Sequence, residues 1–197
     1  MAVTTAGYVL VGGQSSRFGA DKALALWQGR PLALSVAESV RAAAGSVALV
    51  GSTERYADLG LPVIGDPVAG YGPLAGLAAA LDDTAAEWNL VVACDMPHLS
   101  VEFLSFLLSA ASAAQADILL PLDRDGRPEP LCAVYARRCG PAIWDAVRAG
   151  VHKMTEAFHG LLVQNLLFAQ YAAYDRGGRL FANLNTPRDL EAALPAG

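Results

Sequence analysis

The sequence predicts an α/β protein that folds as one domain around a mainly parallel sheet. Short apolar runs alternate along the chain with longer segments rich in alanine and leucine, which is the order of strands and helices in α/β proteins. The apolar runs are continuous, as expected for strands that are covered on both faces. The 197 residues suit a single hydrophobic core, and no repeat, linker or break in composition divides them. We therefore expect one domain over residues 1–197.

Six short apolar runs are the expected strands. They occupy residues 8–11, 47–50, 62–64, 90–93, 118–120 and 131–135. Three helices are expected between them, at residues 32–44, 73–82 and 101–114. In the second of these helices the leucines recur on one stripe, and in the third Phe103, Phe106 and Leu107 share a face, so each helix has one side suited to the sheet.

A further helix is expected to close the chain after Thr186. This residue can cap the first turn, Pro187 suits the first helical position, and the carboxylate of Asp189 can reach back to the cap. Residues 154–178 show no clear pattern, and the sequence predicts no element there.

Composition argues against several classes of protein. The chain has 14 Lys and Arg against 19 Asp and Glu, a net charge of -5, whereas general nucleic-acid binders cluster cations. A membrane-spanning helix needs about 20 nearly unbroken apolar residues. The longest charge-free stretch, residues 157–174, is interrupted by histidine, glutamine and asparagine. We expect neither nucleic acid nor a membrane as a partner.

The compartment is predicted from the N-terminus and the cysteines. No basic segment precedes an apolar run at the start of the chain, so we expect no signal peptide. Cys94, Cys132 and Cys139 form no C-x-x-C pair and suit a reducing compartment better than a disulfide framework. We expect a cytoplasmic protein in which Cys94 is a buried strand residue.

The segment that follows the first expected strand, residues 10–22, is suited to binding phosphate. Paired glycines let backbone N–H groups approach an anion, Ser15 adds a hydroxyl donor, and Arg17 and Lys22 add two positive charges. In open α/β sheets ligands bind at the carboxyl ends of the strands, where this loop lies. The alternative is an ordinary glycine-rich turn with solvated charges.

Two familiar nucleotide motifs do not fit this loop. A P-loop requires G-x-x-x-x-G-K-[ST], but the span from Gly13 to Gly19 is one residue too long and Lys22 lies three residues beyond it. The dinucleotide fingerprint G-x-G-x-x-G is broken at its third position. An NAD-dependent oxidoreductase is therefore disfavoured.

Five blocks in order along the chain resemble the MobA-like nucleotidyltransferases, the family of molybdenum cofactor guanylyltransferase. They are Gly12-Gly13-x-Ser15-x-Arg17-x-Gly19-x-Asp21-Lys22, Gly72-Pro73-Leu74-Ala75-Gly76-Leu77, Cys94-Asp95-Met96-Pro97, Arg127-Pro128-Glu129-Pro130-Leu131 and Asn183-Leu184-Asn185-Thr186-Pro187. The resemblance covers nearly the whole chain. It implies a three-layer, Rossmann-like nucleotidyltransferase fold in a single domain, with a mainly parallel mixed sheet.

Asp95 is the expected metal ligand. It follows an expected central strand and precedes a proline, so we expect its carboxylate at the sheet edge where a nucleotide binds. Mg²⁺ takes one or two carboxylates together with phosphate oxygens and waters, so one aspartate can suffice. We expect Mg²⁺ as the cofactor. The three cysteines and three histidines lack the spacing of a zinc site.

The other candidate nucleotide contacts have a structural alternative. Asp66 ends a strand, and the resemblance places it against the nucleotide, but it also suits a turn before Pro67. Gly72, Pro73 and Gly76 begin a helix whose N–H groups can face an anion, although they also suit helix initiation and close packing. The complete set of expected nucleotide-binding residues is Leu10, Val11, Gly12, Gly13, Ser15, Lys22, Asp66, Gly72, Pro73, Gly76 and Asp95.

The resemblance implies an acceptor side at Arg127 and Glu129, with Asn185 near the active site. A solvated turn is the alternative for the first two, and cap chemistry is the alternative for Asn185. The family's asparagine after the second strand is missing from Val50-Gly51-Ser52-Thr53, which leaves the choice of base open.

The resemblance implies transfer of GMP from GTP to the phosphate of molybdopterin or its molybdenum-loaded form, with release of pyrophosphate. Arg17, Lys22 and Asp95 are the expected catalytic residues, because an anionic phosphate nucleophile needs charge neutralisation more than a base. Transient contacts with proteins that load the cofactor or receive it are expected. The alternatives are a cytidylyltransferase for the same cofactor, a sugar- or alditol-phosphate nucleotidyltransferase, and a nucleotide-binding module without activity.

Overall fold

A computed structural model describes residues 3–12, 21–66, 68, 71–186 and 189–190 of the chain. Its sheet comprises β1 (Thr5–Leu10), β4 (Ala48–Gly51), β5 (Val63–Gly65), β6 (Trp88–Ala93), β7 (Ile118–Pro121), β8 (Cys132–Ala136) and β9 (Val163–Leu166). The helices are α1 (Leu32–Ala44), α2 (Thr53–Tyr56), α3 (Pro73–Asp83), α4 (Val101–Ala113), α5 (Gly140–Arg148) and α6 (Phe168–Tyr171). A two-stranded ribbon, β2 (Leu26–Trp27) and β3 (Arg30–Pro31), precedes α1.

Short 3-10 turns connect several of these elements. They are η1 (Lys22–Leu24), η2 (Ala57–Leu59), η3 (Arg137–Cys139), η4 (Glu156–Phe158) and η5 (Ala172–Tyr174).

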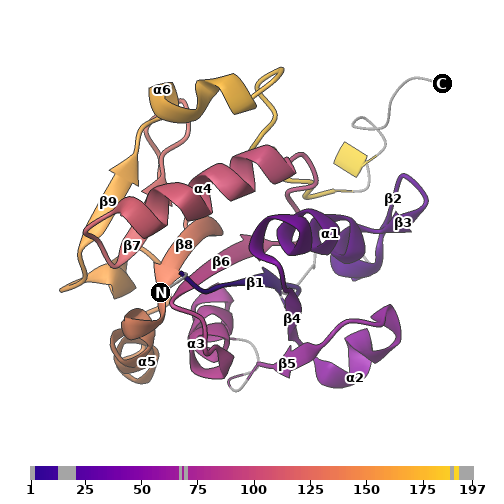
Figure 1. Cartoon of the computed structure of the whole chain (residues 1–197). Helices are drawn as coiled ribbons and strands as arrows, with labels where there is room; N and C mark the ends of the chain where they lie inside the picture. Colours follow the sequence, from indigo (N-terminus) through magenta and orange to yellow (C-terminus); the bar gives the residue numbers. More distant parts are fainter. Residues whose placement is uncertain (1–2, 13–20, 67, 69–70, 187–188, 191–197) are drawn as a thin grey trace.

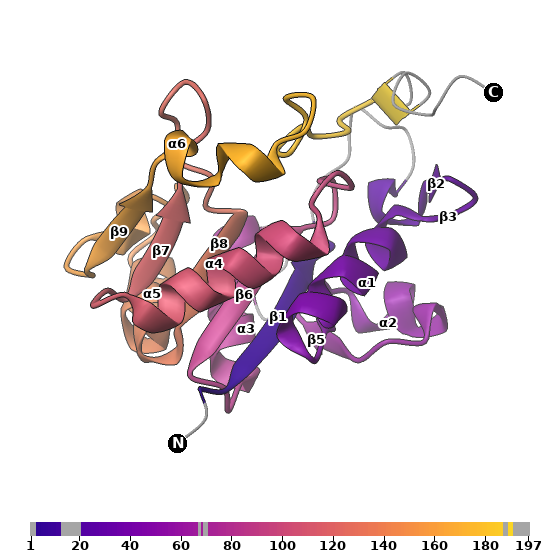
Figure 2. The same cartoon turned by 45° about the horizontal axis from the view of Figure 1, so that its top comes forward.

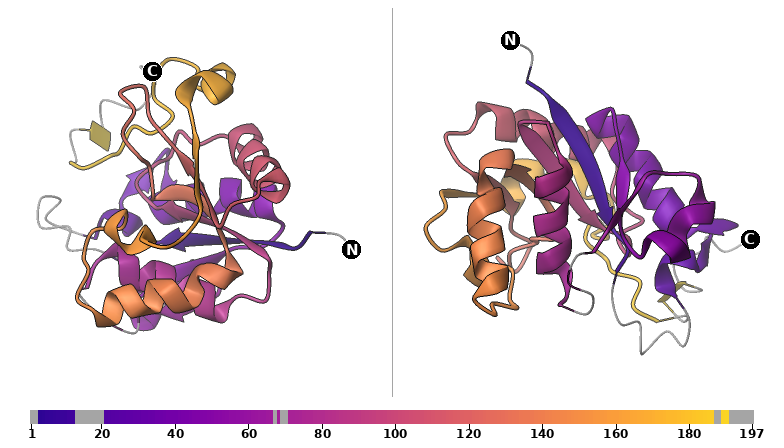
Figure 3. Two further views of the ribbon diagram at one scale, coloured as in Figure 1. Left: turned by 90° about the vertical axis from the view of Figure 1, so that its left-hand side faces the viewer. Right: turned by 90° about the horizontal axis from the view of Figure 1, so that it is seen from below.

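The sheet is mixed and mainly parallel, as predicted. Its order is β5-β4-β1-β6-β8-β7-β9, and β8 alone runs against its neighbours. Helices α1 and α4 pack together over one face, while α3 and α5 cover the other, which gives three layers (Figures 1 and 3). The strands β6, β7 and β8 are buried along their whole length, as their continuous apolar sequences require.

All six expected strands and all three expected helices are present, and their ends differ from the expected ones by at most three residues. The sequence did not predict β9, α5 or α6. Three of the four residues of β9 are exposed, so the strand lacks the apolar run that marked the others. The predicted cap of the closing helix is confirmed: Thr186 Oγ1 accepts from the N–H of Asp189 at 3.1 Å, and Asp189 Oδ2 accepts from the N–H of Thr186 at 2.8 Å. Pro187 lies outside the described residues.

Helix α1 approaches β1 very closely at one glycine. A Cβ atom at Gly7 would lie 2.3 Å from Cγ1 of Val40 and 2.8 Å from the carbonyl oxygen of Ser46. Only a residue without a side chain fits at this contact, which sets the spacing between the helix layer and the centre of the sheet.

The carboxyl ends of β5, β4, β1 and β6 meet at one edge of the sheet. Pairing continues just past the strand ends, because the N–H groups of Val11 and Cys94 donate to Val50 and Leu10 at 3.0 and 3.1 Å. The segment after α6 runs over this side of the molecule toward β2 and β3 (Figure 2), where Leu184 packs with Trp27 and Leu32. This edge therefore joins the start, the middle and the end of the described chain.

None of the helices in the described ranges has the length and apolar character needed to span a membrane.

Candidate active site

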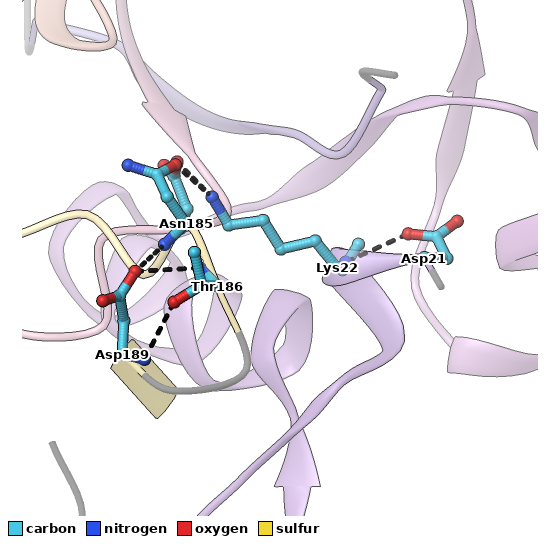
Figure 4. A network of polar contacts seen from close by, with 7 residues as sticks. Asp21, Lys22, Asn185, Thr186 and Asp189 are labelled. Atoms are coloured by element: carbon cyan, nitrogen blue, oxygen red, sulfur yellow. Dashed lines mark hydrogen bonds and ion pairs between the residues drawn. The ribbon is translucent and has the colours of Figure 1, made fainter. Parts of the chain in front are cut away.

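Lys22, Asp95 and Asn185 form one polar cluster at the carboxyl edge of the sheet. Nζ of Lys22 donates to Oδ2 of Asp95 at 2.7 Å and to Oδ1 of Asn185 at 2.8 Å. Figure 4 shows the Lys22 side chain extended from η1 toward Asn185, which belongs to the segment after α6. The side chains of Lys22 and Asp95 are only 13% and 19% exposed, so their interaction is screened less than a surface ion pair. Three predicted site residues are thus brought together.

The second oxygen of Asp95 has no hydrogen-bond partner among the residues that the structure describes. Oδ1 is buried and accepts no hydrogen bond from the described residues, while Oδ2 is occupied by Lys22. A buried carboxylate oxygen without a donor is costly, and a cation at this position would remove the cost. Within the described part of the chain no three His, Cys, Asp or Glu side chains gather into a metal cage. The donor set therefore fits Mg²⁺, which takes one or two carboxylates and completes its shell with phosphate oxygens and water.

Asp21 and Tyr56 hold Lys22 in place. Asp21 caps η1 by accepting from the N–H of Ala23 at 3.0 Å. The Tyr56 hydroxyl lies 2.9 Å from Oδ2 of Asp21 and 2.6 Å from the carbonyl oxygen of Val11, so it shares its one proton between two acceptors. Arg55 pairs with the same Asp21 oxygen at 3.2 Å.

This contact joins the two ends of the segment that the sequence predicts to bind phosphate. Val11 enters the segment and Asp21 leaves it, and Tyr56 contacts both. Tyr56 is 2% exposed, and burial, followed by its bond to Asp21, raises the pKa of its hydroxyl. The sequence analysis did not find this tyrosine. It lies on α2, some 35 positions from Asp21, and only folding brings the two together.

The other nucleotide-binding predictions have different outcomes. Leu10, Val11 and Gly12 lie at the end of β1, beside the cluster. Gly13, Ser15 and Arg17 lie outside the described residues, so these three assignments remain predictions.

Asp66 forms the turn that was its structural alternative. Its Oδ1 accepts from the N–H of Val68 at 3.0 Å, at the end of β5. The carboxyl end of β5 lies at the same edge of the sheet as the carboxyl ends of β1 and β6. A nucleotide contact at Asp66 remains a prediction.

Gly72 and Pro73 begin α3, as expected. Gly72 adopts a φ of 91°, which favours glycine, and Pro73 occupies the first helical position. Gly76 is buried, and a Cβ there would lie 3.2 Å from Cδ2 of Leu10. Its observed role is close packing of α3 on β1, and a nucleotide contact there remains a prediction.

The two predicted acceptor-side residues, Arg127 and Glu129, differ in their exposure to solvent. Arg127 is 74% exposed and pairs with Asp125 at 2.9 Å in the loop between β7 and β8, as in the solvated turn that was its alternative. Glu129 is half-buried, and its pKa rises to about 7 because of burial and then the nearby charges of Asp123 and Asp95. The charge of Asp95 therefore acts on Glu129, and an acceptor contact at either residue remains a prediction.

All three cysteines are buried, and Cys94 is a strand-end residue as predicted. Burial, followed by the charge of Asp95, raises the pKa of the Cys94 thiol to about 12. The thiol is therefore protonated at neutral pH and is not a nucleophile.

These features define a class: a three-layer α/β protein with a lysine–aspartate cluster at the carboxyl edge of its sheet, suited to binding a nucleotide and its metal ion. The family model of the MobA-like NTP transferase domain matches residues 7–161, and the chain belongs to this family.

Proteins similar to this chain carry consistent names. A protein of Trichormus variabilis named "Probable molybdenum cofactor guanylyltransferase" is 36% identical over 92% of this chain and 86% of its own length. A Deinococcus radiodurans protein of the same name is 35% identical over 92% of this chain and 90% of its own. The crystal structure of molybdopterin-guanine dinucleotide biosynthesis protein A from Archaeoglobus fulgidus is 30% identical. It covers 95% of this chain and 96% of its own, with a TM-score of 0.83.

Proposed function

We propose that this protein transfers GMP from GTP to the terminal phosphate of molybdopterin, forming molybdopterin guanine dinucleotide and pyrophosphate. The observation that carries the proposal is the cluster of Lys22 with Asp95 at the sheet edge, in a chain of the MobA-like family. The names of the similar proteins support guanine as the base and molybdopterin as the acceptor.

The reaction needs no general base in this scheme. A phosphate monoester is already anionic at neutral pH, so its oxygen can attack the α-phosphorus of GTP directly. The P–O bond to the leaving pyrophosphate breaks as the new bond forms. The protein must bring two anions together and neutralise the negative charge that they share.

Among the described residues, Lys22 is placed to neutralise the negative charge of the two phosphate groups. Asn185 and Asp95 fix its ammonium from two sides, and Asp21 fixes the turn from which it extends. A donor held in place before the substrates arrive needs no reorganisation during the reaction. In the proposal Asp95 would hold Mg²⁺, and the ion would supply charge neutralisation at the phosphates. Arg17, whose motif implies a second cation, is proposed to bind the leaving pyrophosphate.

Single variants of Lys22 and Asp95 test these roles. Lys22→Ala and Asp95→Asn should each lower kcat/KM for pyrophosphate release by about 100- to 1000-fold, the loss typical of one preorganised electrostatic group. The controls are Lys153→Ala, at the only other lysine, which is 70% exposed, and Asp145→Asn, an exposed surface carboxylate. Near wild-type turnover in folded Lys22→Ala and Asp95→Asn would exclude the mechanism.

The substrates are tested by product identity. The purified protein is incubated with molybdopterin, Mg²⁺ and either GTP or CTP, and the products are identified by mass. We expect the guanine dinucleotide, with little product from CTP. Product from CTP alone would assign a cytidylyltransferase, and transfer to sugar or alditol phosphates in place of molybdopterin would change the acceptor. Omitting Mg²⁺ and adding a chelator should abolish turnover.

A further inference from the structure

Strand β9 forms an open edge of the sheet. It is the last strand in the sheet order, and within the described part of the chain it pairs with β7 alone (Figure 1). The carbonyl oxygens of Leu162 and Leu166 accept hydrogen bonds from the β7 side at 3.1 and 2.9 Å. Because successive residues of a strand face opposite sides, the N–H and C=O groups of Val163 and Asn165 are directed away from β7. These groups make no hydrogen bond with the described residues.

The two edge strands of the sheet differ in how they are protected. At the other edge, β5 has three residues, follows Pro62 and precedes Asp66 and Pro67 in the sequence. Short length, proline and charge keep an edge strand from pairing with another chain. Strand β9 contains neither proline nor a charged residue, and its register with β7 is unbroken, so no bulge turns it away. Of the two edges, β9 is therefore the one open to a further strand.

The surface around β9 is apolar and uncharged. The longest charge-free stretch of the chain, residues 157–174, contains this strand. Three of the seven large apolar side chains that are exposed among the described residues lie here: Leu162, Val163 and Leu167 are 65%, 37% and 55% exposed. Exposed apolar side chains that gather in one segment indicate an interaction surface. Since the segment carries no charge, an identical segment can approach it without repulsion.

The backbone of β9 is complementary to itself in one register. A two-fold axis pairs a strand antiparallel with its own copy. If Val163 lies opposite Asn165 of the second copy, every outward N–H group of both strands meets an outward carbonyl oxygen. A shift by two residues would place these groups opposite Leu161 or Leu167, whose N–H groups already donate within their own chain. Only the first register pairs all of the outward groups.

The side chains agree with this register. It places Gln164, which is exposed, opposite Gln164 of the second copy. A side-chain amide carries both donors and an acceptor, so two such amides can bond each other across the axis. Leu162 lies opposite Leu166 of the second copy, which adds an apolar contact on either side of the two glutamines. The strand thus matches a copy of itself in backbone, polar and apolar groups.

We propose that this protein forms a two-fold symmetric dimer by antiparallel pairing of β9 with β9 of a second copy, which joins two seven-stranded sheets into one continuous sheet. The assembly stops at two chains, because pairing uses both β9 edges and the remaining edge, β5, is protected. The axis turns the carboxyl edges of the two sheets to opposite sides, so both candidate active sites stay open. The dimer does not depend on the proposed function, since the edge strand alone carries it.

Mass measured against concentration tests the dimer. Two short strands with their flanking leucines make a small interface, below about 1,200 Å² in total, so light scattering should cover about 1 to 200 μM. We expect the mass of the wild type to rise from 20.5 kDa toward twice that value. Gln164→Lys sets two ammonium groups face to face and should weaken the dimer at least about 10-fold. Leu162→Lys should weaken it as well. Leu26→Lys, at a leucine that is 59% exposed on β2, is the matched control and should leave it unchanged.

Cross-linking through introduced cysteines tests the register. In the proposed pairing the Cα atoms at position 164 of the two copies are about 4.5 Å apart, within reach of a disulfide. Those at position 165 lie diagonally, about 7–8 Å apart, where a bridge requires backbone movement. With a mild oxidant such as oxidised glutathione, Gln164→Cys should therefore form at least about 10-fold more covalent dimer than Asn165→Cys. The native cysteines are buried, which limits their part in the reaction.

Three results would overturn the proposal. The first is a wild-type mass of 20.5 kDa at every concentration. The second is a dimer that Gln164→Lys and Leu162→Lys leave intact, with urea midpoints that show both variants folded. The third is equal cross-linking of Gln164→Cys and Asn165→Cys.

Discussion

Removing the charge of Glu129 should make the protein more stable at alkaline pH. Burial and two nearby carboxylates raise the pKa of this group from 4.5 to about 7 in the folded protein. Because the folded-state pKa is the higher one, the associated stability is present in full below pH 4.5 and is lost as the pH rises through 7. A difference of this size corresponds to about 3 kcal/mol. Solvent screening at a half-exposed group reduces it to about 1–2 kcal/mol.

The assay is urea unfolding of wild type and Glu129→Gln at several pH values between 4 and 8. At pH 8 the variant should be more stable by about 1–2 kcal/mol, and the difference should vanish near pH 4, where both forms carry an uncharged side chain. Asp125→Asn, in the exposed part of the same loop, should show no such trend. A difference that is equal at pH 5 and pH 8, or a variant that is less stable at pH 8, would refute the reasoning.

Three further predictions concern the rest of the fold. Tyr56→Phe removes the hydroxyl that contacts both Val11 and Asp21, at the two ends of residues 10–22. The loss of about 1 kcal/mol in hydrogen bonding should raise KM for GTP by about 5- to 10-fold. The control Tyr8→Phe removes a hydroxyl that contacts Asp83 and should leave KM unchanged, and equal KM values in both variants would contradict the role of Tyr56. Gly7→Ala should lower the free energy of unfolding by about 1–3 kcal/mol through overlap with Val40, as measured by urea unfolding, and an unchanged midpoint would contradict the close approach of α1 to β1. Asp117 accepts from the N–H of Leu162 and pairs with Arg138, and these contacts lower its pKa. The stability that a lowered pKa contributes is full above the unfolded value of 3.8 and declines as the pH falls below it, so Asp117→Asn should destabilise the protein more at pH 7 than at pH 3 in urea unfolding. Equal losses at both pH values would argue against the assignment.

The core of the fold could be predicted from sequence because burial on both faces leaves a direct signal. The six expected strands include β6, β7 and β8, whose residues are all buried, and every one of these was found. Strand β9 was not predicted, because it lies at the sheet edge with three exposed residues. Its pairing with β7 joins residues 45 positions apart in the sequence. Local periodicity carries no information about such a partner.

The active-site contacts also divide into those that the sequence predicted and those that depend on tertiary packing. Lys22 and Asp95 were predicted to share a site from their places after two strands, and their contact follows once those strands are neighbours. The contact of Tyr56 with Asp21 was not predicted, because it depends on where the single turn of α2 packs after β4. The cavity lined by Glu129, Phe168 and Tyr171 was not predicted either, since both aromatic residues belong to residues 154–178, for which no element was expected.

The reversal of β8 explains how Glu129 comes to lie near Asp95. Strand β6 ends at the active edge, and β8 begins there because it runs in the opposite direction, so the N–H of Ala93 donates to the carbonyl of Leu131 at 2.8 Å. If β8 were parallel to β6, its first residues would lie at the far edge, about 15–20 Å away at 3.3 Å per residue. The loop before β8, which carries Glu129, would then be remote from Asp95. In the proposed mechanism the parallel strands present the nucleotide at their carboxyl ends, and the single antiparallel strand presents the acceptor at its amino end, so that one sheet edge aligns two substrates.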